Sequence, residues 1–173
     1  MKLKLIRQFI ASLGRFHISL RRIVKEKISG FTIIELMIVI SILAVLATIG
    51  IPYYQDYKDR INLNHAMVDI LSIEALIEHF YTDNRSYPNT LSDVGVGTRL
   101  DPWGNPYQYL DITKEKGKGN LRKDKSLSPI NSDYDLYSMG KDGQSAMPLT
   151  VKVSQDDIIR ARNGQFVGLA SDF

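Results

Sequence analysis

A single acidic residue, Glu35, lies within a long apolar stretch near the start of the chain. From Phe31 to Ile51 there are twenty-one residues, and Glu35 is the one charged residue among them. A helix rises about 1.5 Å per residue, so this stretch is long enough to cross the roughly 30 Å hydrocarbon core of a bilayer. A carboxylate in such a segment costs about 2.5–3.5 kcal/mol on insertion scales. We therefore expect Glu35 to be paired with a cation.

A second group of oxygen-bearing side chains lies near the C-terminus. Asp142 stands in a glycine-flanked turn over 140–143, and Asp156 and Asp157 form an acidic pair further on. Hard cations such as Ca²⁺ bind six to eight oxygens from carboxylates and backbone carbonyls. The chain has no cysteine, so a metal ion is the obvious substitute for disulfides in an exported domain. Spacing alone leaves a second interpretation open, in which Asp156 caps a helix over 157–162.

Positive charge is concentrated at the N-terminus. The net charge is +3, but residues 1–30 hold eight Lys or Arg and one acid, so the remainder has 14 basic and 18 acidic residues, a net charge of −4. Positive residues before an apolar span hold that side in the cytoplasm, so we expect the C-terminal domain to face outward. The basic loop over 113–126 has no aromatic residues to stack on bases, so we expect no nucleic-acid partner.

The apolar residues between 53 and 81 recur every three or four positions, which predicts the amphipathic outer half of one long helix. The helix should stop near 83–85, before Tyr87-Pro88. Alternation over 133–139 predicts a strand that turns at 140–143, and Tyr107 should begin another strand after a turn rich in proline and glycine. The predicted buried stripe of the helix consists of Ala66, Ile70, Ile73, Ile77 and Phe80.

Residues 1–30 allow two interpretations. Their apolar residues are near helical spacing, which is typical of a cytoplasmic helix that stays on the membrane surface. The other interpretation is a leader that is removed after Gly30. An ordinary secretory signal is cut after its apolar run, whereas here the small residue precedes the run, which indicates a cut on the cytoplasmic side.

The sequence Ser-Gly-Phe-Thr-Ile-Ile-Glu-Leu over 29–36 resembles the prepilin peptidase motif of type IV pilins and type II secretion pseudopilins. In that family the peptidase cuts after the glycine and methylates the new terminal phenylalanine, so Gly30 would be the cleavage residue and Phe31 the mature N-terminus. Glu35 and Pro52 then become the fifth and twenty-second mature residues, where the family has these residue types. The resemblance implies that Glu35 neutralises the N-terminus of a neighbouring subunit. The alternative is that Glu35 lies near the interface and reaches water.

Pro52 interrupts the helical pattern two residues after Gly50. Proline inside a helix removes one hydrogen bond and clashes with the preceding turn, which produces a kink or a melted turn. The corresponding stretch in filaments of the resembling family is often unwound, so 50–52 is predicted to be a flexible joint. The alternative is that the membrane span ends here and a new helix starts after it.

Residues 101–107 resemble the Asp-Pro-Trp-Gly-x-x-Tyr signature of the major pseudopilin of type II secretion. Major pseudopilins bind calcium in the turn and acidic segment that follow a strand like 133–139. Two departures from the family are a longer loop over 146–153 and a different tail over 160–166. The implied calcium ligands are the carbonyls of Met139 and Gln144 and the carboxylates of Asp142, Asp156 and Asp157.

The implied fold is α+β and type IV pilin-like, with a long N-terminal helix, its first half transmembrane, packed against a small antiparallel sheet. The predicted parts are a leader at 1–30, a transmembrane or filament-core half-helix at 31–52, an amphipathic half-helix at 53–84, and a periplasmic α+β domain with a calcium-type loop at 85–173.

The implied function is structural, and the residues contain no acid/base or nucleophilic constellation that would indicate an enzyme. The chain would be a subunit of a type II secretion pseudopilus, held in the inner membrane by one span and assembled into a helical homo-oligomer in the periplasm. Its partners would be the prepilin peptidase, minor pseudopilins and the inner-membrane assembly platform. The alternatives are a type IV pilus or DNA-uptake pilin, a membrane-anchored periplasmic binding protein that does not polymerise, and a membrane-tethered hydrolase.

Overall fold

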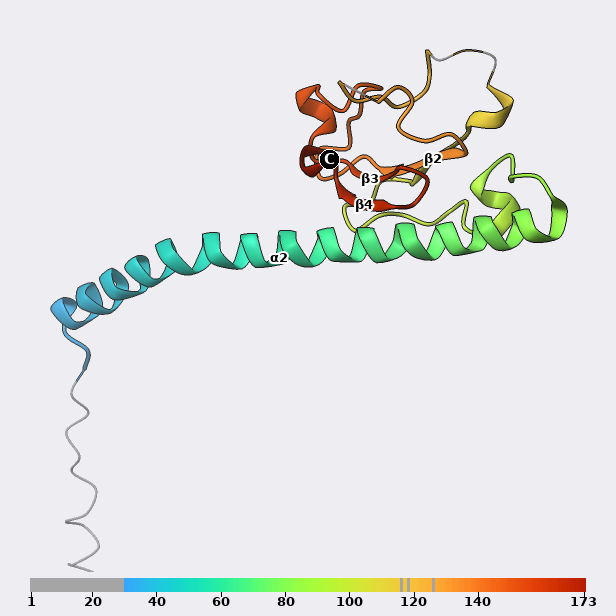
Figure 1. The fold of residues 1–173 in the computed structure, drawn as a ribbon. Coiled ribbons are helices and arrows are strands. Elements are labelled where there is room, and N and C mark those ends of the chain that lie inside the picture. Colours follow the sequence, from blue (N-terminus) through green and yellow to red (C-terminus); the bar gives the residue numbers. More distant parts are fainter. Residues whose placement is uncertain (1–29, 116, 118, 126) are drawn as a thin grey trace, which may run out of the picture. The chain divides into compact units, whose positions relative to one another are not determined.

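The computed structural model describes residues 30–173 except 116, 118 and 126, so the predicted leader, apart from Gly30, lies outside the described residues. One long helix, α2 (Ile33–Asn84), is followed by four strands and several short 3-10 turns (Figure 1). The chain divides into two units between Gly50 and Ile51. The predicted α+β class, a long N-terminal helix with a small antiparallel sheet, is confirmed.

Helix α2 continues without interruption through Pro52 and ends at Asn84. The end agrees with the stop predicted near 83–85, and Arg85, which follows the helix, has a left-handed φ of 55°. The backbone at Gly50 and Pro52 is helical, so this chain on its own does not adopt the predicted melted turn. The flexible joint therefore stays a prediction for the assembled state.

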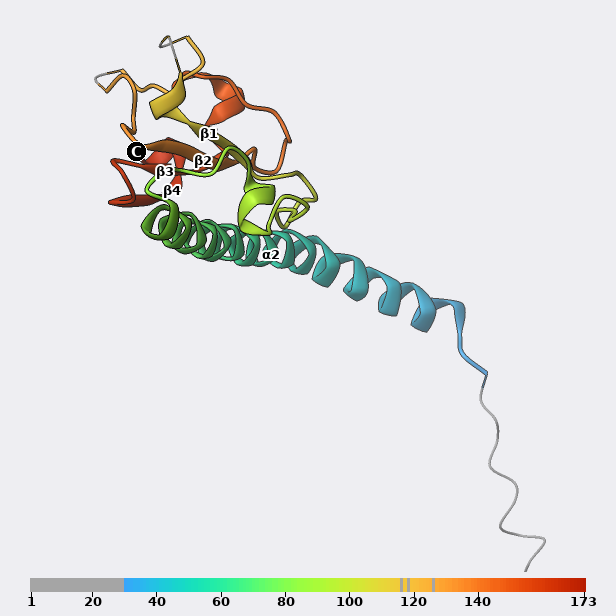
Figure 2. The same ribbon diagram turned by 90° about the vertical axis from the view of Figure 1, so that its right-hand side faces the viewer.

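The sheet is antiparallel, and its strands lie side by side in the order in which they occur along the chain (Figure 2). The strands predicted over 133–139 and after Tyr107 are present, and they are the first two neighbouring strands in this order. The other two were not predicted from the sequence. The strands are β1 (Gln108–Asp111), β2 (Tyr134–Ser138), β3 (Ile158–Ala161) and β4 (Phe166–Leu169).

The helix considered over 157–162 is wrong, because Ile158–Ala161 form strand β3. Ile158 and Ile159 are β-branched and favour extended backbone. Every residue of β3, including Arg160, is buried, so the strand has no exposed face and its sequence does not alternate. A short apolar run of this kind cannot be told from a buried helix by periodicity alone.

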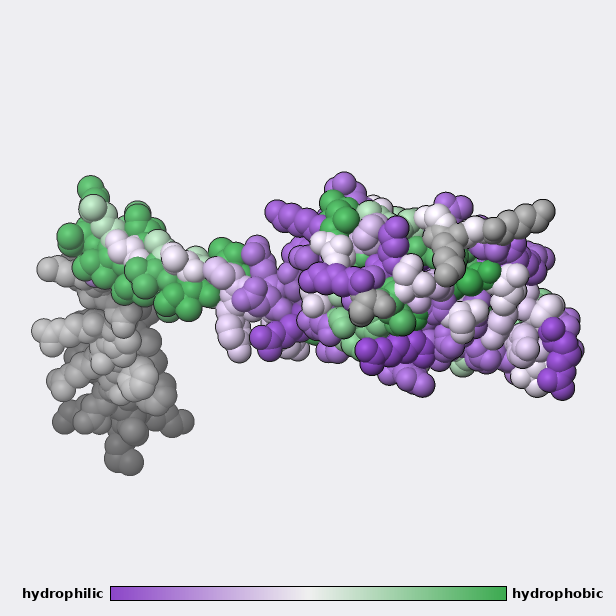
Figure 3. Space-filling view, turned by 45° about the horizontal axis from the view of Figure 1, so that its top comes forward, coloured by the Kyte–Doolittle hydropathy of each residue, from purple (hydrophilic) through white to green (hydrophobic). Residues whose placement is uncertain are grey.

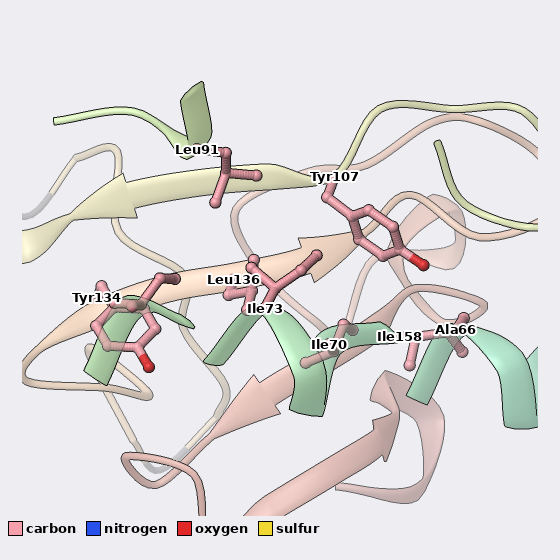
Figure 4. Close-up of a cluster of buried hydrophobic side chains, with 9 residues drawn as sticks. Ala66, Ile70, Ile73, Leu91, Tyr107, Tyr134, Leu136 and Ile158 are labelled. Atoms are coloured by element: carbon pink, nitrogen blue, oxygen red, sulfur yellow. The ribbon is translucent and has the colours of Figure 1, made fainter. Parts of the chain in front are cut away.

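The outer half of α2 packs on the sheet through the predicted stripe. Phe80, the last predicted member, is only half-buried. In Figure 4 the stripe faces Tyr134 and Leu136 from β2 and Ile158 from β3, which belong to the same core cluster. Full burial of one aliphatic side chain contributes about 1.5–3 kcal/mol, so this stripe is the main attachment of the helix to the sheet. The fully buried members of the stripe are Ala66, Ile70, Ile73 and Ile77.

Asp101 fastens the proline- and glycine-rich turn to the end of β2. Its Oδ1 accepts hydrogen bonds from the amides of Trp103 at 3.0 Å and Asn105 at 2.8 Å. Its Oδ2 accepts one from the Ser138 hydroxyl at 2.5 Å. The Asn105 side chain in turn donates to the carbonyl of Gly140 at 3.0 Å. This turn therefore positions the segment in which the sequence predicts a cation site.

Candidate functional site

The first turn of α2 is closed by a reciprocal pair of polar side chains. The Thr32 amide and hydroxyl both donate to Glu35 Oε2, at 2.8 and 2.9 Å, and the Glu35 amide donates to the Thr32 hydroxyl at 3.2 Å. This is a capping box, in which Thr32 precedes the first helical residue, Ile33, and Glu35 occupies the third helical position. Phe31 lies just before it, is 78% exposed, and is not helical.

The capping box gives Glu35 a partner within its own chain. The carboxylate satisfies amide and hydroxyl donors at the helix start, where the helix dipole also favours negative charge. The Thr-x-x-Glu spacing directly before an apolar run is a sequence signal for such a cap, and the interpretation of Glu35 as an intersubunit ligand overlooked it. Any pairing of Glu35 with another chain through Oε2 must therefore compete with Thr32.

The residues after this cap carry an apolar surface on all sides. Large aliphatic side chains from Ile33 to Ile51 are exposed, and Figure 3 shows them as a continuous hydrophobic surface over the first part of α2. Within the described part of the chain, α2 is the one helix long and apolar enough to cross a membrane. A helix that is apolar all round needs either lipid or other helices around it.

The acidic residues near the C-terminus hold a tight turn after β2. Asp156 Oδ2 accepts hydrogen bonds from the amides of Lys141 at 3.0 Å and Asp142 at 3.1 Å. The exposed Asp142 accepts one from the Gln144 amide at 2.8 Å. Gly140 has a φ of +65°, and a Cβ there would lie 2.3 Å from the carbonyl oxygen of Asp156, so only glycine fits. Asp156 thus caps this turn instead of a helix.

The Asp157 side chain does not join this turn and is fully buried. Its Oδ2 accepts hydrogen bonds from Arg122 Nη2 at 2.6 Å and from the Ser145 hydroxyl at 2.5 Å. Burial raises the pKa of the Asp157 carboxyl to about 6, although Ser145 and Arg122 both favour its ionised form. Its Oδ1 has no hydrogen-bond partner among the described residues. Arg122 was not among the predicted site residues.

The predicted calcium ligands do not fit a calcium site as they are arranged. The carboxylate of Asp156 is bound to backbone amides, Asp157 is bound to a guanidinium, and Asp142 is exposed and bound to its own turn. The described residues do not bring three acidic or histidine side chains to one point. Met139, directly after β2, and Gln144 lie in the same turn region. Calcium binding therefore stays a prediction that the side-chain arrangement does not support.

A second buried arginine ties the sheet to the helix. Arg160 of β3 donates from Nε to Glu74 Oε1 of α2 at 2.7 Å and from Nη2 to Asp133 Oδ2 at 2.7 Å. Its guanidinium carbon lies 4.0 Å from the ring centroid of Tyr134. A guanidinium can be buried when its donors are paired in this way, so Arg160 acts as a polar cross-link between α2 and β3.

Comparisons with known proteins relate this chain to type II secretion system core proteins and, over a shorter length, to a fimbrial protein. Residues 26–51 match the family described as the prokaryotic N-terminal methylation motif. The chain is 31% identical to the type II secretion system core protein G of Pseudomonas aeruginosa over 137 residues, which cover 67% of this chain and 85% of that protein. The corresponding protein of Aeromonas hydrophila is 32% identical over 142 residues, covering 70% and 88%. A fimbrial protein of Neisseria meningitidis is 32% identical over 83 residues, covering 48% and 49%.

Proposed function

This chain belongs to the family of the type II secretion system core protein G, and we propose that it is the repeating structural subunit of a type II secretion pseudopilus. Its similarity to the type II secretion system core protein G covers 85% of the Pseudomonas protein and 88% of the Aeromonas protein. Its similarity to the fimbrial protein covers 49%. The greater coverage supports secretion over a type IV pilus or DNA uptake.

The observation that carries this proposal is the exposed apolar first part of α2, which begins with the capping box of Thr32 and Glu35. The large aliphatic side chains from Ile33 to Ile51 pack against no other part of the described chain and are exposed. In the membrane, lipid covers these side chains. After assembly the same side chains would pack against those of neighbouring subunits, so that the filament core replaces the bilayer as their apolar surroundings.

Processing would come first. A prepilin peptidase would cut between Gly30 and Phe31 and methylate the new amine. This cut removes the basic leader and places a positive charge at the start of the apolar helix. The charge of that amine is the cation that Glu35 was expected to need.

Assembly would then move Glu35 from one partner to another. Its carboxylate leaves the Thr32 amide and hydroxyl and pairs with the terminal amine of Phe31 in the next subunit. Removing one partner of a buried ion pair costs about 3–5 kcal/mol. Only one axial stagger of the helices brings the two charges together, so the pair would set the register of the filament.

The surroundings of the subunit follow from its charge distribution. The basic residues before the apolar span would stay in the cytoplasm, and the domain after Pro52 would lie in the periplasm. The subunit would wait in the inner membrane until the assembly platform extracts it. Minor pseudopilins would be its heterologous partners, and more copies of the same chain its main ones.

Mass spectrometry of the protein purified from membranes tests the processing step. The expected mature protein begins with N-methylated Phe31. Replacing Gly30 by Asp should block the cut, whereas the matched neighbour Ser29→Ala should still be cut, because the family motif places cleavage after the glycine. A wild-type protein that keeps residues 1–30 would refute the proposal.

A further inference from the structure

The loop between β2 and β3 is held by a buried arginine from an earlier segment of the chain. Arg122 is 1% exposed. It donates from Nη1 to the Ser145 hydroxyl and from Nη2 to Asp157 Oδ2, both at 2.6 Å. The Ser145 hydroxyl donates to the same Asp157 oxygen at 2.5 Å. These three side chains form a closed triangle that joins the start of the loop, its end and the segment around residue 122.

The position of Arg122 is fixed by hydrogen bonds of its backbone and by the contact of its guanidinium with an aromatic ring. Its amide donates to Asp135 Oδ2 at 3.0 Å, and its carbonyl accepts from the Ile130 amide at 3.0 Å. Its guanidinium carbon lies 4.0 Å from the ring centroid of Tyr137. Asp135 and Tyr137 both belong to β2, so the guanidinium rests on the sheet and reaches the loop from there. A cation over an aromatic ring gains further electrostatic stabilisation.

The loop is also attached to the neighbouring segment by its backbone. The Lys123 backbone amide donates to the carbonyl of Met147 at 3.1 Å, and the Leu149 amide donates to the Lys123 carbonyl at 2.9 Å. The Ser154 hydroxyl donates to the carbonyl of Ala146 at 2.9 Å and accepts from the Ala146 amide at 2.8 Å. The loop is therefore folded onto the segment that carries Arg122.

We infer that the Arg122 guanidinium, in place of a calcium ion, supplies the positive charge that holds the 145–157 loop on the sheet, so that the domain reaches full stability without a metal. The guanidinium already neutralises Asp157, the one fully buried carboxylate of the predicted ligand set. A calcium ion at Asp157 would lie within a few ångströms of this fixed positive charge and be repelled by it. The inference concerns the folded domain and does not depend on whether the chain polymerises.

Thermal unfolding of the full chain in detergent micelles, followed by near-ultraviolet circular dichroism, tests this inference. The wild-type Tm should be the same in millimolar calcium and in excess chelator. Arg122→Met should lower Tm on the order of 10 °C, because one partner of a buried ion pair is removed and Asp157 stays buried without its cation. Lys125→Met is the matched control, since it removes an exposed cation from the same segment, and it should leave Tm unchanged.

Two results would overturn the inference. One is a saturable rise of the wild-type Tm by more than about 5 °C with calcium, the size that a well-bound ligand produces. The other is an Arg122→Met protein as stable as the wild type. If Arg122→Met does not fold, Arg122→Lys gives the second measurement. It keeps the charge but loses the forked donors, so its Tm should fall below that of the wild type.

Discussion

At the scale of single residues, Glu35 has two possible partners that differ in chemistry. In one chain it accepts hydrogen bonds from Thr32, which needs an acceptor oxygen but not a charge. In the proposed filament it pairs with an amine, which needs the charge. Glutamine can replace glutamate in a capping box, but it cannot neutralise a buried cation. One substitution therefore separates the two roles.

Replacing Glu35 by Gln should leave the start of the helix intact and abolish filament assembly. Thr32→Val is the matched variant, because it removes the hydroxyl of the cap and keeps the charge, and it should assemble at near wild-type yield. The measurement is the amount of subunit recovered in filaments from the periplasm of cells that express the secretion genes. Normal filament yield from Glu35→Gln would show that the charge pair does not set the assembly register.

The N-terminal site stays a prediction from a recognisable motif, whereas in the C-terminal site the acidic residues have partners that were not predicted. Gly30, Phe31 and Glu35 are recognisable because their motif is contiguous, and the capping box could have been read from the same residues. Arg122, the partner of Asp157, could not be predicted from the sequence. It lies 35 residues away, in a segment with the composition of a solvated basic loop. Its burial follows only once β2 brings Tyr137 beneath the guanidinium.

At the scale of elements, the attachment of α2 to the sheet depends on a narrow stripe. Ile73→Ala should destabilise the folded domain by about 2–5 kcal/mol, because it leaves a cavity at a fully buried position. Val68→Ala lies on the same helix but is 63% exposed, and it should change stability by less than about 0.5 kcal/mol. Denaturant unfolding followed by near-ultraviolet circular dichroism measures both. Equal losses would mean that the stripe is not the main contact.

The elements that the sequence predicted are those with a local pattern. The outer half of α2 shows a repeat of three to four residues, and β2 shows alternation before a glycine turn. Strands β3 and β4 pair through Ile158 with Leu169 and Ile159 with Gly168. That pairing depends on the tight turn at Arg162, Asn163 and Gly164, all with positive φ. The Asn-Gly pair in this turn is a strong hairpin signal, so the turn could have been predicted from the sequence.

At the scale of the whole molecule, buried tyrosines make the domain sensitive to alkali. Burial raises the pKa of Tyr87 to about 12 and also raises the pKa values of Tyr107, Tyr109 and Tyr134 above the ordinary value of 10. A group whose pKa is raised by folding stabilises the folded state while it is protonated in both states. That contribution is complete below pH 10 and is lost as the pH rises toward 12 and beyond.

The free energy of unfolding should therefore fall steeply above about pH 10. Tyr109→Phe removes one of the phenols that must ionise and should make the decline shallower. Tyr57→Phe, which removes a side chain that is 58% exposed, is the matched control and should follow the wild type. Phenolate absorbance, recorded with circular dichroism across the same pH range, measures ionisation and unfolding together. Complete phenolate formation before any loss of structure would contradict the expectation.

The capping box has a further consequence for the proposed cut. Proteases bind their substrates as open backbone, and a helix must unwind before it can be cut. Because Thr32 and Glu35 set the start of α2 at Ile33, the bond between Gly30 and Phe31 lies outside the helix. The same glutamate that would join two subunits in the proposed filament would thus also keep the bond proposed for cleavage outside the helix.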